Sequence, residues 1–231
     1  MLAVPDGAIA GLADEIARLG APGDGCVALH LSGVQTAQVL APLAQCGYAV
    51  GSLHPLQTVA DPGQGAGRLR GSFFTFEGDD RARAAAAEVV EAAGGEMLEV
   101  RAADKARYHA ACVFASNYII ACAAAATRLL GEAAGTGREE ALRALQPLWR
   151  GAVSNLEELG LPRALTGPLA RGDAETVRKH MATLRGETRL LYGRLALEAL
   201  TLSRELGLAA DVADAIEAEI RECIEGGGES E

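Results

Sequence analysis

The spacing of apolar residues changes near residue 102, and this change divides the chain into two parts. In the first part, short apolar runs alternate with segments that repeat apolar residues every three or four positions, as residues 8–19 do. These are the periods of buried strands and amphipathic helices. We expect strands at residues 2–4, 26–31, 48–53, 72–76 and 97–100, and helices at residues 8–19, 35–45 and 81–93. Strands separated by helices of this length predict a mostly parallel β-α-β sheet.

The second part contains helical patterns and no strand pattern. We expect helices at residues 103–130, 138–159, 173–206 and 209–224. Pro147 is expected to bend or break the second of these helices, and Asp173 is expected to cap the third at its N-terminus. The predicted organisation is a sheet domain at 1–102, an all-helical domain at 103–225 and a flexible, glycine-rich tail at 226–231.

The composition excludes several classes of protein. The 231 residues carry 21 Lys and Arg against 31 Asp and Glu, a net charge of −10, and only 4% are aromatic. A nucleic-acid-binding protein requires basic and aromatic surfaces, so we expect no nucleic-acid partner. The five cysteines form no CxxC pair, and the chain opens without a signal peptide. We therefore expect a reduced, cytoplasmic protein without a bound metal.

Residues 110–126 are almost wholly apolar and approach the length of a membrane span. Most of them are alanine, and Ser116 and Asn117 lie in the middle, whereas a membrane span is typically rich in Leu, Ile and Val. We interpret this segment as a buried core helix and expect no association with a membrane.

Residues 63–71 contain repeated glycines that resemble a phosphate-binding turn. Such a turn follows a strand and begins a helix. This segment instead follows Asp61 and Pro62 and precedes an expected strand, so we interpret residues 61–71 as a mobile loop.

Lys105 and His109 lie four positions apart on the helix that opens the second part. This spacing places both side chains on one face of the helix, together with Cys112 and Ser116. A lysine ammonium can donate a proton to a carbonyl oxygen, and an imidazole can orient the substrate or carry the proton. The alternative is an ordinary surface Lys and His at the start of a helix, with the Cys and Ser as small packing residues.

Two groups of polar residues lie at the carboxyl ends of two of the expected strands. One group is Ser52, His54 and Gln57, and the other is His30, Ser32 and Gly33. Ligands of open α/β sheets bind at the carboxyl ends of the strands, where such groups can donate and accept hydrogen bonds. The alternatives are a polar turn fixed by Pro55 and an ordinary strand-to-helix connection.

Arg171 lies in an expected loop between helices, at residues 165–173. Its guanidinium can bind an anion through two parallel hydrogen bonds. Alternatively, it caps the preceding helix or pairs with Asp173.

Six motifs, in their order along the chain, resemble the Rossmann-like and DUF2520 domain proteins. They are LAVPD at 2–6, HLSG at 30–33, GSLHPLQT at 51–58, FEGD at 76–79, KARYHAACVFASNY at 105–118 and LTGPLARGD at 165–173. These proteins look like members of the 6-phosphogluconate-dehydrogenase-like superfamily, with pyrroline-5-carboxylate reductase, prephenate dehydrogenase and ketopantoate reductase as relatives. The resemblance implies an α/β fold, in which the C-terminal part of a Rossmann-like parallel sheet domain precedes an all-helical dimerisation domain.

The resemblance also implies an activity and its residues. It implies an oxidoreductase that uses NADP or NAD and acts on a small carbonyl, hydroxy-acid or imine substrate in the cleft between the domains. Several relatives use a Lys-x-x-x-Asn pair, which Lys105 and His109 match with His in place of Asn. The implied catalytic residues are Lys105, His109 and Asn117, the implied substrate-binding residues are Ser52, His54, Gln57 and Arg171, and the implied cofactor-binding residues are Val4, Pro5, His30, Ser32 and Gly33.

The sequence departs from the family pattern at its start. Members of the family begin with a strand, a G-x-G-x-x-G turn and a helix, whereas this chain starts at what resembles the fourth strand. We expect that the start is misassigned and that the natural protein is longer. The alternative is a short chain that has lost cofactor binding and acts as a non-catalytic dimeric ligand-binding or interaction module. In both cases we expect a homodimer through the helical domain.

Overall fold

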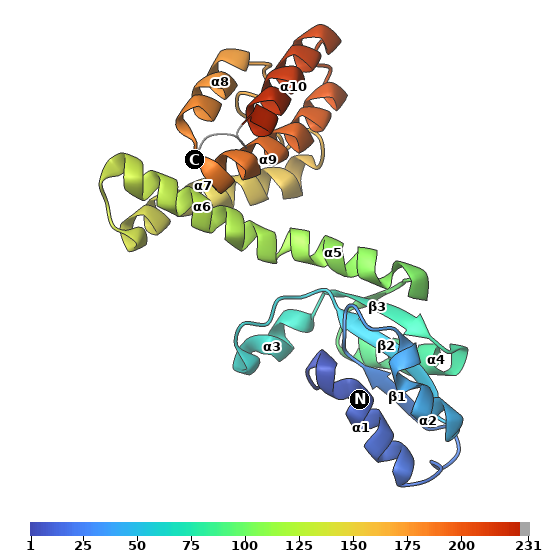
Figure 1. Ribbon diagram of the computed structural model, residues 1–231. Helices are drawn as coiled ribbons and strands as arrows, with labels where there is room; N and C mark the ends of the chain where they lie inside the picture. The colour runs from blue at the N-terminus through green and yellow to red at the C-terminus, as the bar shows by residue number, and fades with distance from the viewer. Residues whose placement is uncertain (227–231) are drawn as a thin grey trace. The chain divides into compact units, whose positions relative to one another are not determined.

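A computed structural model describes residues 1–226 of the chain, without the side chains of residues 62, 64 and 66. The chain forms two compact units, of which the first is Met1–Ala121 and the second begins at Cys122 (Figure 1). Alternating strands and helices give way to helices alone at the 3-10 helix η2 (Ala102–Asp104). The first unit therefore also contains the helix that opens the helical part. The expected flexible tail falls, apart from Gly226, outside the described residues.

The first unit is built on a four-stranded sheet with the strand order β1-β2-β3-β4. The strands are β1 (Val27–His30), β2 (Ala49–Pro55), β3 (Phe73–Gly78) and β4 (Glu96–Glu99). Strands β1 and β2 pair in parallel, as do β3 and β4, whereas β2 and β3 pair antiparallel. The expected strand at residues 2–4 is reduced to a single parallel bridge between Leu2 and His30. The prediction of a mostly parallel sheet is confirmed.

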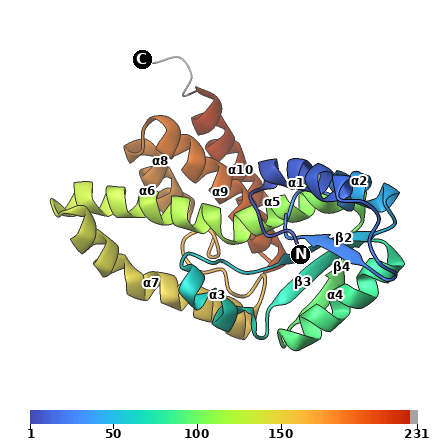
Figure 2. The same cartoon turned by 90° about the horizontal axis from the view of Figure 1, so that it is seen from below.

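Helices cover both faces of this sheet (Figure 2). On one face lie α1 (Asp6–Arg18), the 3-10 helix η1 (Ala37–Leu40) and α2 (Ala41–Gln45), and on the other lies α4 (Asp80–Ala92). The first core contains Leu2, Ile9, Ala13, Ala28, Ala37, Leu40, Leu43 and Val50. The second contains Leu29, Ala49, Leu53, Phe74, Phe76, Ala82, Ala86 and Val90. Alternate residues of β1 and β2 enter opposite cores, as the two-residue period of a strand requires.

The segment expected to be a mobile loop contains the helix α3 (Pro62–Leu69), so that prediction is wrong. The Asp61 side chain caps this helix by accepting a hydrogen bond from the Gly63 backbone N–H at 2.9 Å. An N-cap Asp followed by Pro at the first helical position is a strong helix start, and here it outweighs the glycines. A glycine-rich helix offers little apolar surface to lie across a sheet, which accounts for the antiparallel return from β2 to β3 in place of a β-α-β crossover.

The long helix expected at residues 103–130 is interrupted at Ser116. It forms α5 (Lys105–Ala115) and α6 (Asn117–Ala134), and Ser116 itself has φ −129° and ψ −72°. The Ser116 hydroxyl donates to the Cys112 carbonyl at 2.7 Å. A serine that bonds to the carbonyl four residues earlier competes with the helical hydrogen-bond ladder, which explains the break.

The expectation that this segment is a buried core helix is wrong for the single chain. Phe114 is 65% exposed and Ile120 is 70% exposed. The helical stretch Ala102–Ala134 is long and apolar enough to cross a membrane by length and composition alone, and a single stretch of this kind is weak evidence for a span. Its apolar side chains project from the helices without a covering element among residues 1–226.

The second unit is helical throughout its described residues. After α6 it contains α7 (Arg138–Leu159), α8 (Ala174–Thr183), α9 (Gly186–Glu205) and α10 (Ala210–Glu225). Its core lies between α8, α9 and α10 and contains Val177, Met181, Ala196, Leu200, Ala213, Ile216, Ile220 and Ile224. Pro147 does not break α7.

The segment expected to form one helix at 173–206 forms two, because Leu184 and Arg185 have extended backbones and Gly186 has φ +48°. Asp173 caps α8 as predicted, accepting from the Thr176 backbone N–H at 3.0 Å.

Candidate functional site

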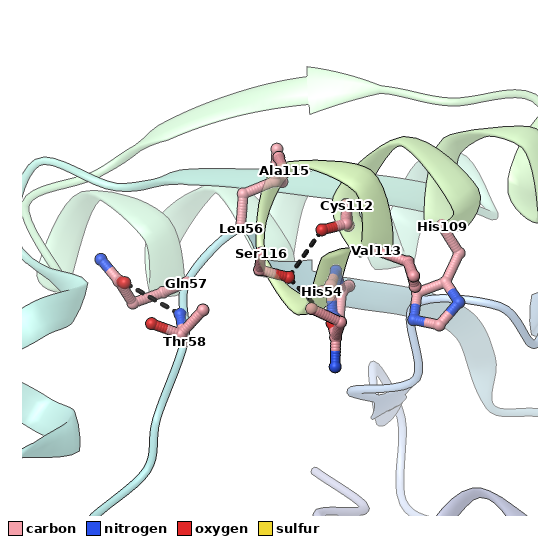
Figure 3. A pocket seen from close by; sticks show the side chains of 10 residues that line it. His54, Leu56, Gln57, Thr58, His109, Cys112, Val113, Ala115 and Ser116 are labelled. Carbon is pink, nitrogen blue, oxygen red and sulfur yellow. Dashed lines mark hydrogen bonds between the residues drawn. The ribbon is translucent and has the colours of Figure 1, made fainter. Parts of the chain in front are cut away.

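The carboxyl ends of β1 and β2 lie side by side, because the parallel register pairs His30 with Ser52. This register brings together the two polar groups that the sequence places after these strands. A cavity of about 610 Å³ lies in the same unit, between the end of β2 and helix α5 (Figure 3). Its polar lining residues are His54, Gln57, Thr58, His109, Ser116 and Asn117.

His54 is the half-buried residue that links the sheet to α5. Its Nδ1 lies 2.5 Å from the hydroxyl oxygen of Tyr108, and the two rings meet edge to face with their centroids 5.7 Å apart. Burial lowers the pKa of His54 to about 4, and the nearby charges of Lys105 and His109 act in the same direction. Asp6 acts weakly in the opposite direction. His54 is therefore a neutral imidazole near pH 7.

His109 stands beside His54 on the cavity wall (Figure 3). The two rings are 6.1 Å apart and nearly perpendicular. Both rings approach Gly33 closely: a Cβ at that position would lie 2.6 Å from His109 Cδ2 and 3.0 Å from His54 Nε2. Glycine at position 33 therefore leaves the room that lets the two imidazoles meet the turn after β1.

Lys105 is buried and is not among the residues that line the cavity. It is only 1% exposed, and its Nζ donates to Ser52 Oγ at 2.7 Å and to the Ser32 carbonyl at 3.2 Å. Ser52 in turn donates to the same Ser32 carbonyl at 3.0 Å. Burial lowers the pKa of Lys105, opposed by the more distant charges of Glu77 and Asp6. Lys105 thus ties the two strand ends to α5, and in this arrangement it does not reach the cavity as a direct proton donor would.

His30 is fully buried, and both of its ring nitrogens bond to the backbone. Nδ1 accepts from the Ser32 N–H and Nε2 lies 3.1 Å from the Thr36 carbonyl, which defines a neutral Nε2–H tautomer. Burial also lowers the pKa of His30. Both ring nitrogens thus bond to the backbone, and His30 supports the turn at residues 31–36. Its contact with a cofactor stays a prediction.

Ser32 connects that turn to the start of α1. Its hydroxyl donates to Asp6 Oδ2 at 2.8 Å and accepts from the backbone N–H groups of Val34 and Gln35. Val4 packs half-buried at the edge of the first core, and Pro5 is exposed at the N-cap of α1. Leu2 forms a parallel bridge with His30, so this segment lies beside the end of β1. The contact of Val4, Pro5 and Ser32 with a nicotinamide stays a prediction.

The remaining predicted residues differ in their placement. The Gln57 amide donates to the Arg68 carbonyl at 3.0 Å and accepts from the Thr58 N–H at 2.8 Å, so it organises the segment after β2. Asn117 is exposed at the cavity, and its Oδ1 lies 2.9 Å from Ser116 Oγ. Arg171 belongs to the second unit and is exposed next to the N-cap of α8.

Sequence reasoning did not identify Tyr108 and Asp6 as site residues. Tyr108 lies three positions after Lys105, and this helical spacing was the available signal. Asp6 follows the first strand residues, in the place where the carboxyl end of a strand meets a helix. No cluster of three metal-ligating side chains occurs among the residues that the structure describes.

Comparison with known proteins assigns the class of the fold and then the family. Residues 1–55 match the Rossmann-like domain, and residues 72–199 match the domain of unknown function DUF2520. The first unit therefore has a Rossmann-like fold. The chain belongs to the DUF2520 family.

Solved structures support the same fold. Protein TM1727 from Thermotoga maritima is similar with a TM-score of 0.72 and 24% identity, over 88% of this chain and 77% of that one. BF3122 from Bacteroides fragilis, described as a candidate NADP oxidoreductase, has a TM-score of 0.65 and 20% identity, over 86% and 73%. Pyrroline carboxylate reductase from Plasmodium falciparum, solved with NADP bound, has a TM-score of 0.53 and 12% identity, over 99% and 80%. No curated protein matches the chain.

Proposed function

We propose that the chain functions as an NAD(P)-dependent oxidoreductase that acts on a small carbonyl, hydroxy-acid or imine substrate. The observation that carries this proposal is the convergence of His54, His109 and the turn at Ser32 and Gly33 beside one cavity at the carboxyl ends of β1 and β2. Open α/β sheets bind their ligands at this edge. The names of the similar NADP-binding structures agree with such a role.

The residues present fit one end of the cofactor better than the other. The turn after β1 and the end of β2 offer uncharged hydrogen-bonding groups to a nicotinamide ring, which supplies or accepts the hydride when the cofactor is bound. The sequence contains no G-x-G-x-x-G turn for the pyrophosphate. The start of α1 carries the Asp6 carboxylate, which disfavours an anion at that helix N-terminus. We therefore assign these residues to the nicotinamide end alone.

We assign the proton transfer to His109, because it lies on the cavity wall and its imidazole can exchange a proton with a substrate oxygen or nitrogen. Lys105 is then a positioning residue that holds Ser52 and the Ser32 carbonyl in place. Asn117 at the cavity edge would orient the substrate, and the binding of a substrate carboxylate by Arg171 stays a prediction.

Turnover of NADPH with a panel of small ketones and imines tests the proposal. His109→Ala is expected to lower kcat/KM by about a hundredfold, the usual contribution of a general acid or base. His180→Ala is the matched control, since His180 is exposed on α8 of the second unit and its imidazole bonds to Tyr192. Equal activity of the two variants would remove His109 from the mechanism.

Lys105→Met tests the positioning role against direct proton donation. A positioning role predicts weaker substrate binding together with lower stability, whereas direct donation predicts a loss confined to kcat. Lys179→Met is the control, because Lys179 is the second of the two lysines in the sequence and makes an ion pair with Glu175 within α8.

A second candidate function is a non-catalytic dimeric ligand-binding or interaction module. The observation in its favour is the exposure of large apolar side chains on α5, α6 and α7, including Phe114, Ile119, Ile120, Leu148 and Val153. Exposed apolar surface of this kind marks an interaction site, and we propose a second copy of the chain as the partner.

A further inference from the structure

The contact between His54 and Tyr108 is not used in the function proposed above, although it is one of the short side-chain contacts of the site. The two polar atoms are 2.5 Å apart. Hydrogen bonds from O–H donors are shorter than those from N–H donors, which favour about 2.9 Å to oxygen. The short separation favours the Tyr108 hydroxyl as the donor and His54 Nδ1 as the acceptor.

The surroundings of the pair keep both groups neutral. Burial raises the pKa of Tyr108, so the phenol keeps its proton. Burial, Lys105 and His109 lower the pKa of His54 to about 4, against the weaker influence of Asp6. A neutral imidazole whose Nδ1 accepts a hydrogen bond carries its proton on Nε2.

This Nε2–H is open to a ligand. Nε2 has no hydrogen-bond partner among the side chains and backbone groups that the structure describes, and His54 lines the cavity. A Cβ at position 33 would lie 3.0 Å from Nε2, so the glycine keeps the space beside it clear. His54 thus presents one neutral donor at the place where the turn after β1 meets the cavity.

The cavity wall has no permanently charged side chain to offer a ligand, and its titratable imidazoles are those of His54 and His109. Its lining residues include no Asp, Glu, Lys or Arg within the described part of the chain. A buried ionised ligand group needs a partner of opposite charge, whereas an uncharged carbonyl needs only a hydrogen-bond donor.

We propose that Tyr108 is a positioning residue that fixes His54 as a neutral Nε2–H donor, and that this donor binds the carbonyl oxygen of an uncharged ligand group. The identity of that group rests on the proposed function. It is either the carboxamide of the nicotinamide or the carbonyl of the substrate. The arrangement of Tyr108 and His54 does not depend on either ligand.

The first test reads the tautomer of His54 in the ligand-free full chain by long-range ¹H–¹⁵N NMR with labelled histidine. The sequence has four histidines, so the signals can be assigned by single His→Gln variants. We expect the Nε2–H form in the wild type, with His30 as an internal reference for the same form. Tyr108→Phe is expected to produce a mixture of tautomers and to leave the His30 signals unchanged.

Tyr192→Phe is the matched control. It removes the same kind of contact, since His180 Nδ1 lies 2.8 Å from Tyr192 Oη, but at an exposed position of the second unit. This variant is expected to leave His54 unchanged. An Nδ1–H tautomer of His54 in the wild type, or an Nε2–H tautomer that persists fully in Tyr108→Phe, would overturn the positioning role.

The second test compares neutral and anionic probes, with the His54 Nε2 shift as the readout. The pairs are nicotinamide against nicotinate and cyclopentanone against cyclopentanecarboxylate. A response to nicotinamide identifies the cofactor carboxamide as the ligand group, and a response to cyclopentanone identifies the substrate carbonyl. A stronger response to either acid, or no response to any probe, would overturn the proposed ligand class. Failure of NADPH to bind while the tautomer test succeeds would refute the proposed function and leave the positioning role standing.

Discussion

His54 is neutral in the folded chain, and its protonation is therefore coupled to stability. Its pKa falls from 6.5 to about 4 on folding, so the unfolded chain binds more protons between these values. The stabilisation is fully present above pH 6.5 and is lost as the pH falls through 6.5 toward 4. The effect is at most about 3 kcal/mol, from the 1.36 kcal/mol that corresponds to each unit of pKa, and solvent screening of the half-buried imidazole reduces it.

The difference in unfolding free energy between the wild type and His54→Gln, measured by urea denaturation from pH 7 to pH 4, checks this prediction. The difference is expected to shrink or change sign at the acid end, because the variant has no imidazole to protonate. The loss of the Tyr108 contact adds only a pH-independent offset. A difference that stays constant over the whole range would contradict a neutral, buried His54.

Any larger side chain at position 33 is expected to destabilise the folded chain. The Cβ of Gly33→Ala would meet His109 Cδ2 at 2.6 Å, so the imidazole must move. We expect a destabilisation of about 1–3 kcal/mol, as for other overpacked sites, and a displaced His109 signal in NMR spectra.

Gly11→Ala is the matched control for this substitution. Gly11 lies inside α1, and a Cβ added at this position would meet no neighbouring group within 4 Å. Replacing a helical glycine by alanine is expected to stabilise by about 0.5–1 kcal/mol. Equal effects of the two substitutions, measured by chemical denaturation, would mean that Gly33 leaves no specific room for the histidines.

Single residues of the site were predictable where one strong pattern identified them. Ser52 and His54 lie near the carboxyl end of an expected strand, which predicts a ligand-binding edge. The structure places both residues in β2. The burial of Lys105 and His30 was not predictable, because it depends on the parallel register of β1 and β2, which brings backbone carbonyls within reach of both side chains. Tyr108 was missed for the same reason, since its partner lies 54 positions earlier in the sequence.

At the scale of elements, the cap of α8 gives a direct prediction. Asp173 accepts from the Thr176 backbone N–H at 3.0 Å and from its hydroxyl at 2.7 Å, and these bonds lower the pKa of the carboxyl. Asp173→Ala is expected to cost about 1 kcal/mol, whereas Asp173→Asn, which keeps a capping oxygen, costs only a few tenths.

The midpoint of unfolding followed by helical circular dichroism measures both Asp173 variants. The alanine variant is expected to unfold at a lower denaturant concentration than the asparagine variant. Identical midpoints would mean that α8 does not depend on its cap.

The elements themselves were largely predictable from the period of apolar residues, and their errors have local causes. The helix α3 was missed because glycine content obscured an Asp-Pro start. The interruption at Ser116 was missed because a serine within an apolar run gives no periodic signal, and only its bond to the Cys112 carbonyl shows its effect. The antiparallel pairing of β2 and β3 depends on what the connecting segment can bury, which apolar spacing within the strands does not report.

At the scale of the whole molecule, the exposed apolar faces predict self-association. Ile120 is 70% exposed on α6, and its neighbours Ile119 and Tyr118 are about half exposed. Burying such surface is favourable by about 25 cal/mol per Å². Sedimentation velocity is expected to show a dimer of the wild type and a monomer of Ile120→Glu.

Leu19→Glu is the control for the sedimentation experiment. Leu19 is 86% exposed at the end of α1, away from the apolar faces of α5, α6 and α7 in the sequence. This variant is expected to remain a dimer. A monomeric wild type at all concentrations would contradict the proposed homodimer.

The sequence predicted the class of fold and the family at this scale, because both are distributed over many short motifs. It did not predict the exposure of residues 110–126. Apolar composition is the same for a core helix and for a helix whose apolar face is covered by a second chain. Burial is a property of the assembly, and composition reports only the tendency to be buried.

We propose that the cavity beside His54 and His109 receives the nicotinamide end of the cofactor. Saturation-transfer NMR with NADP and the full chain tests it directly, because it reports which protons of the dinucleotide contact the protein. We expect strong transfer to the nicotinamide ring, reduced in His54→Gln and unchanged in Tyr192→Phe. Transfer confined to the adenine, or none to any part of the cofactor, would contradict the account and favour the non-catalytic module.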